Sequence, residues 1–126
     1  SGHTTEADDM LARILWWGEK LPYWGDSLYA DRPDYRKDTP LQCMIDGLAV
    51  AQMYIFGLFG ITPNADGSVT VNPHLPPLAK EMALQNVKLL GQEFDVVVSG
   101  DSFHVNLENL KKESTLGRPI ILTKPK

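Results

Sequence analysis

The stretch TPLQCMIDGLAVAQMYIFGLFGI, residues 39–61, decides the fold of this 126-residue chain. Thr39 supplies a hydroxyl at an N-cap position, Pro40 occupies the first helical position, and Gln42 stands where a capping box places its glutamine. These features predict a helix that begins at Pro40 and continues to Phe59, with glycines close by that can end it.

The predicted helix is apolar on almost every side. Its apolar side chains are Met44, Ile45, Leu48, Val50, Met53, Tyr54, Ile55, Phe56, Leu58 and Phe59. A helix without a polar face is stable when other elements surround it. One more helix and a small sheet cannot cover every side of this helix. We therefore expect further helices of a larger protein, or self-association, to cover residues 44–59.

A membrane span is the rival interpretation of this helix. The run from Met44 to Ile61 approaches the roughly 20 apolar residues that cross a bilayer. However, Asp46 and Gln52 lie inside the run, and no Lys or Arg flanks its far end. We therefore expect no membrane partner.

The chain divides into a helical part and an extended part on either side of this stretch. Upstream, apolar residues at helical spacing predict a helix from about Glu6 to Trp17, and a loop rich in Pro, Gly and Asp follows from Glu19 to Asp38. Downstream, alternating patterns predict four or five strands. They lie at residues 68–72, 84–90, 93–98, 102–107 and 118–123, with an extended proline-rich connection at 73–77. The prediction is an α+β chain, with a helical hairpin in residues 1–60 and an antiparallel β-domain in residues 61–126.

The order of these features resembles the C-terminal end of six-hairpin glycosidases, the maltose-phosphorylase and trehalose-phosphorylase-like group and its bacterial relatives. In that family an apolar helix ends in a Gly-Leu-like turn and is followed by a short strand, a Pro-x-Leu-Pro connection and a hairpin. The matching motifs are TPLQ (39–42), GLFGI (57–61), VTVN (69–72), PHLPP (73–77) and KLLGQEFDV (88–96).

The resemblance implies a larger parent enzyme. Residues 1–60 would be the last helical hairpin of a truncated (α/α)6 barrel, and residues 61–126 a sandwich-like C-terminal β-domain. The parent would cleave glycosidic bonds of a carbohydrate substrate by paired-carboxylate hydrolysis or phosphorolysis. Its general acid would lie on a hairpin outside these residues, so the chain alone would be inactive. The resemblance also favours a periplasmic or extracellular location.

The loop between the two helices carries the residue types of a sugar site, carboxylates and aromatic rings. The resemblance places this loop at the active-site end of the barrel. The candidate catalytic carboxylates are then Asp26 and Asp38, and the candidate substrate-binding residues are Tyr23, Trp24 and Gln42. Each has a structural alternative. Asp26 can form a turn, Asp38 can favour the dipole of the following helix, Gln42 can complete the capping box, and the aromatic rings can pack between helices.

Composition excludes several other classes of protein. The net charge of -4, without a clustered basic patch, argues against a nucleic-acid partner. His3, His74 and His104 lack ligand spacing with one another or with the single Cys43, so we expect neither a metal site nor a cofactor.

Two further functional classes stay open. The chain could be a non-catalytic module that braces a barrel or binds sugar, or a small protein that self-associates through its apolar helix. Within the β-domain, Phe94 and Phe103 are the only aromatic residues. Two rings are too few for a stacking platform, so bracing is favoured over sugar binding.

Overall fold

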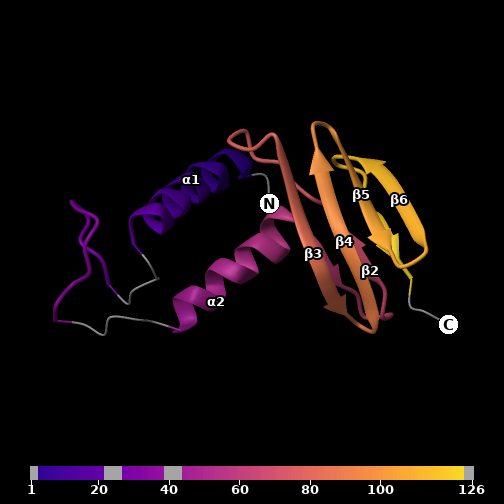
Figure 1. Cartoon of the computed structure of the whole chain (residues 1–126), viewed down its shortest axis with the longest axis horizontal. Coiled ribbons are helices and arrows are strands. Elements are labelled where there is room, and N and C mark those ends of the chain that lie inside the picture. Colours follow the sequence, from indigo (N-terminus) through magenta and orange to yellow (C-terminus); the bar gives the residue numbers. More distant parts are fainter. Residues whose placement is uncertain (1–2, 22–26, 39–43, 124–126) are drawn as a thin grey trace. The chain divides into compact units, whose positions relative to one another are not determined.

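The computed structural model describes residues 3–21, 27–38 and 44–123, and the chain forms two units, residues 1–51 and residues 52–126 (Figure 1). The described part of the first unit contains helices α1 and α2, and the second contains a short π-helix and two antiparallel sheets. This mixed architecture confirms the α+β class. The helical barrel and the domain boundary after residue 60 stay predictions.

Helix α1 spans Thr4–Lys20 and is longer at both ends than predicted. Leu11 is its buried residue, and the helical spacing places Ile14 and Leu15, which are half-buried, beside it. The helix ends where Leu21 adopts an extended conformation and donates its N–H to the carbonyl of Trp17.

The predicted apolar helix is α-helical at first and then π-helical. Helix α2 spans Met44–Gln52, and the π-helix η1 spans Met53–Leu58. Gln52 has helical dihedral angles, so one segment passes directly into the other. On α2, Ile45 is 73% exposed and Leu48 is 58% exposed. The capping sequence at residues 39–42 and Cys43 lie outside the described residues.

The second unit is built of two antiparallel sheets (Figure 1). The three-stranded sheet has the order β1-β2-β7, with strands β1 Ile61–Pro63, β2 Val69–Val71 and β7 Ile120–Leu122. The four-stranded sheet follows chain order, with strands β3 Glu81–Leu89, β4 Gln92–Ser99, β5 Ser102–Leu107 and β6 Leu110–Thr115. Residues 72–76 are in no strand, as the proline-rich connection predicts.

The two sheets share one hydrophobic core, which makes the unit a β-sandwich. Strand β4 alternates strictly between buried and more exposed residues, the pattern of a strand with one face on the core. The core consists of Phe59, Ile61, Val69, Val71, Phe94, Val96, Val98, Phe103, Val105, Ile120 and Leu122.

The β3–β4 hairpin forms as the sequence predicts. Leu90 and Gly91 both have positive φ and form a two-residue turn that pairs Leu89 with Gln92. A register shift between Leu84 and Val87 marks a β-bulge. Here the backbone N–H of Asn86, also at positive φ, donates a 2.8 Å hydrogen bond to the carboxylate of Asp95.

Two strands were not predicted, so the expected count of four or five strands was too low for the seven that the described residues contain. Strand β1 is three residues long and ends in a proline, too short for alternation to show. Strand β6 carries Lys111, Lys112 and Glu113, a composition typical of a turn. It is an edge strand, and charged side chains are common on edge strands.

The chain passes from helix into sheet at Gly60. The carbonyl of Gly60 accepts a hydrogen bond from the N–H of Asn72 (3.2 Å), and the carbonyl of Leu58 accepts one from His74 (2.7 Å). These bonds extend the β1–β2 pairing past the strand ends. Gly60 has φ +57°, and a Cβ built there would lie 2.0 Å from the carbonyl oxygen of Asn72. Only glycine fits this position.

We predict that Gly60→Ala destabilises the chain by more than about 2 kcal/mol. A left-handed conformation costs an L-residue about 1–2 kcal/mol, and the clash with Asn72 adds to that cost. Gly100→Ala is the matched control, because Gly100 has φ +60° with nothing within 4 Å of the added Cβ. Urea unfolding followed by circular dichroism measures both variants. Equal losses of stability would contradict the close approach at Gly60.

Candidate functional site

The segment after α1 folds back on itself. Within residues 27–38, Leu28 and Tyr35 form an antiparallel bridge, and the N–H of Arg36 donates to the carbonyl of Ser27. The N–H of Tyr29 donates to the carbonyl of Asp34 (3.2 Å). The predicted loop is therefore a hairpin-like structure over its described length.

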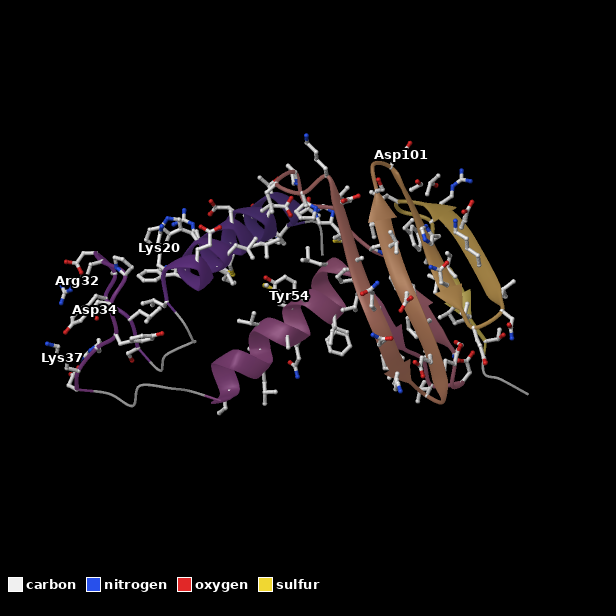
Figure 2. All side chains as sticks on the ribbon, viewed as in Figure 1. Lys20, Arg32, Asp34, Lys37, Tyr54 and Asp101 are labelled. Atoms are coloured by element: carbon white, nitrogen blue, oxygen red, sulfur yellow. The ribbon has the colours of Figure 1, made fainter. Side chains whose placement is uncertain are left out.

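A hollow of about 450 Å³ lies between α1 and this segment. Its size is in the range of small-molecule sites. Helix α1 contributes Trp16 and Trp17, and the folded segment contributes Asp31 and Arg32. The remaining lining residues are Ala12, Arg13, Ala30 and Pro33. Figure 2 shows Lys20 on α1 and Arg32 and Asp34 on the segment that follows it.

The two tryptophans give the hollow an aromatic wall. Their rings meet edge to face, with centroids 5.1 Å apart and an interplanar angle of 85°. Trp16 is 46% exposed, so much of its ring is available to a ligand. The ammonium group of Lys20 lies 5.8 Å from the centre of the Trp16 ring.

Arg32 is held in place by three neighbours. Its guanidinium carbon lies 3.5 Å from the centre of the Tyr29 ring. It also donates to both carboxylate oxygens of Asp31, at 3.3 and 3.4 Å, and approaches Asp34 at 3.9 Å. Arg13 is similarly paired with Asp9, at 2.9 Å. The charges around the hollow are thus matched in pairs.

The position of Asp38 in the structure bears on its candidacy as a catalytic residue. Arg36 donates two hydrogen bonds to the Asp38 carboxylate and holds its pKa below the ordinary value of 3.8. A carboxyl group with a lowered pKa stays ionised at neutral pH and cannot donate a proton. This geometry suits a structural ion pair or a carboxylate that acts while charged.

The other predicted site residues, Tyr23, Trp24, Asp26 and Gln42, lie outside the described residues. The hollow instead contains Trp16 and Arg32, which are not predicted site residues, and Asp31, one of the loop carboxylates that the sequence marks as able to hydrogen-bond to a sugar. The spacing of Tyr29 and Arg32 in a segment rich in aspartates is the sequence feature that could have drawn attention to them.

A second hollow, of about 640 Å³, lies on the outer surface of the β-sandwich. It is lined by Asn86, Gly91, Glu93, Phe94, Asp95, Asn106, Leu107 and Glu108. One of its carboxylates, that of Asp95, already accepts a hydrogen bond from the backbone N–H of Asn86 at the β3 bulge. Among the described residues, no group of three or more His, Cys, Asp or Glu side chains could hold a metal ion.

No protein-family model, curated protein or solved structure matches this chain. Over the ranges that the structure describes, neither α1 nor any other helix is long and apolar enough to cross a membrane.

We predict that Asp38 titrates below 3.8, and that Arg36→Ala raises its pKa toward that value, because the variant removes the hydrogen bonds that stabilise the carboxylate. Carboxyl ¹³C chemical shifts followed from pH 2 to 7 measure both. The stability that this pair contributes is present above pH 3.8 and is lost as pH falls through the lowered folded-state pKa. An unchanged Asp38 pKa in Arg36→Ala would contradict the pairing.

Proposed function

We propose that this chain is the C-terminal part of a carbohydrate-active enzyme that cleaves glycosidic bonds with paired carboxylates, using water or phosphate as acceptor. The proposal starts from the resemblance to six-hairpin glycosidases. Its main structural support is the exposure of Ile45 and Leu48 on an almost wholly apolar helix. In a helical barrel, neighbouring helices would cover both side chains.

Burying Ile45 and Leu48 under neighbouring helices would stabilise the protein substantially. Burying a leucine or isoleucine side chain contributes about 1.5–3 kcal/mol. Two such residues on one short helix therefore favour association with other helices over exposure to water. The covering helices, in this proposal, belong to the same parent enzyme.

The β-sandwich serves as a brace in this proposal. Sugar-binding modules present exposed aromatic rings, but Phe94 and Phe103 are each only 2% exposed. They are the only aromatic residues after Ile61. The sandwich therefore lacks a stacking platform, and its role is to support the helical part.

The carboxylates of this chain would assist a proton donor that lies elsewhere in the parent enzyme. Asp26 stays a candidate for the second carboxylate. Asp38 has a lowered pKa, so its role would be that of a charged group or of a structural partner to Arg36.

Self-association is the second candidate, because exposed apolar residues would also support it. In that case Ile45 and Leu48 would be covered by a second copy of this chain. Light scattering separates the two, since a soluble, defined oligomer with this helix at its interface favours self-association.

The test compares the complete protein that contains this chain with the 126-residue chain alone. We predict that the complete protein cleaves nitrophenyl glycosides, or maltose or trehalose in the presence of phosphate, while the isolated chain does not. Cleavage by the isolated chain, or no cleavage of any glycoside by the complete protein, would contradict the proposal.

A paired variant tests the covering helices directly. Leu48→Glu is expected to destabilise the complete protein by about 1.5 kcal/mol or more, because it places a charge where an apolar side chain is buried. The same change should leave the stability of the isolated chain nearly unchanged. Leu110→Glu is the control, since Leu110 is similarly exposed but lies at the β5–β6 turn. Thermal unfolding of the two proteins and their variants gives the comparison.

A further inference from the structure

The hollow between α1 and residues 27–38 has the features of a site for an uncharged polyhydroxylated ligand. It combines the partly exposed aromatic side chain of Trp16 with a carboxylate and a guanidinium group side by side in Asp31 and Arg32. A ring face packs against the apolar C–H surface of a cyclic ligand. An adjacent acceptor and donor then match neighbouring hydroxyl groups, which both donate and accept hydrogen bonds.

The charge pattern disfavours an ionic ligand. Arg32 is already paired with Asp31, and Arg13 is paired with Asp9. Lys20 lies near the Trp16 ring, which partly balances its charge. No large excess of either sign is therefore left to select a phosphate or an ammonium group.

The acceptor and donor are also oriented in advance. Tyr29 supports the guanidinium plane of Arg32, and both carboxylate oxygens of Asp31 accept from the same nitrogen of that group. These contacts restrict the two side chains in part before a ligand binds, so less conformational entropy is lost on binding.

We propose that this hollow binds one ring of a neutral oligosaccharide, with Trp16 as the stacking platform and Asp31 and Arg32 as the hydrogen-bonding pair. The proposal rests on the proposed function in one respect only: it places part of the parent enzyme's sugar recognition in this chain. Because Asp31 and Arg32 stand largely in solvent, we expect weak binding, with a Kd on the order of 1 mM.

The experiment uses the ¹⁵N-labelled 126-residue chain and follows the indole N–H signals of its three tryptophans by NMR. The probes are maltotriose and cellotriose, with inorganic phosphate and a proline-rich peptide as probes of the other ligand classes. Single Trp→Phe variants assign the signals. The expected result is a saturable shift of the Trp16 signal with at least one trisaccharide, and no such shift with phosphate or peptide.

Variants locate the binding. Trp16→Ala and Asp31→Asn should each weaken trisaccharide binding at least about tenfold, the first by removing the platform and the second by removing the charged acceptor. Asp31 is exposed, so its variant is expected to fold even if Trp16→Ala does not. Phe56→Ala is the control, because Phe56 is an exposed aromatic residue that does not line the hollow. It should leave the affinity unchanged.

Three results would overturn the proposal: no shift of the Trp16 signal up to saturating sugar in the folded chain, full affinity in Asp31→Asn, or binding of the peptide or phosphate instead. The outcome is separate from that of the proposed function. Sugar binding in the hollow without glycoside cleavage by the complete protein would support the sugar site and contradict the proposed enzyme function. Glycoside cleavage without sugar binding in the hollow would support the enzyme function and contradict the sugar site.

Discussion

The close approach of two backbones at Gly60 is the constraint on which the described fold depends. It ends the apolar helix, places Phe59 and Ile61 in the core, and joins the π-helix to the connection after β2 through the Leu58–His74 hydrogen bond. A side chain at residue 60 would force these two backbone segments apart. The sandwich can therefore follow the helix without a linker.

Much of the sandwich was predictable because its strands bury one face. The alternating patterns of β4 and β5 predict the central strands, and the turn at Gly91 predicts the hairpin between β3 and β4. The strands that were missed lie at sheet edges, where pairing with a neighbour decides the structure and local sequence says little. Strand β6 shows this well, since Lys112 bonds across to the carbonyl of Ile121 on β7 (3.1 Å). That contact depends on the three-dimensional structure.

The candidate site was less predictable, for a different physical reason. Trp16 belongs to a helical apolar stripe, and Asp31 and Arg32 belong to a charged loop, so each has an ordinary local explanation. Only the fold of residues 27–38 against α1 brings them to one hollow. Residue type and the resemblance favour Asp26 and Asp38 as catalytic carboxylates, and the one that the structure describes, Asp38, is held by Arg36.

We propose that the β-sandwich, which has its own hydrophobic core, is joined to a helical part whose exposed Ile45 and Leu48 are covered by other helices. Amide hydrogen exchange, compared between the isolated chain and the complete protein, tests this most directly. We predict equal protection of the strands between residues 61 and 122 in both, and at least about tenfold greater protection of residues 44–51 in the complete protein. Equal protection of residues 44–51 in the two would contradict the account, because the helix would then need no covering helices.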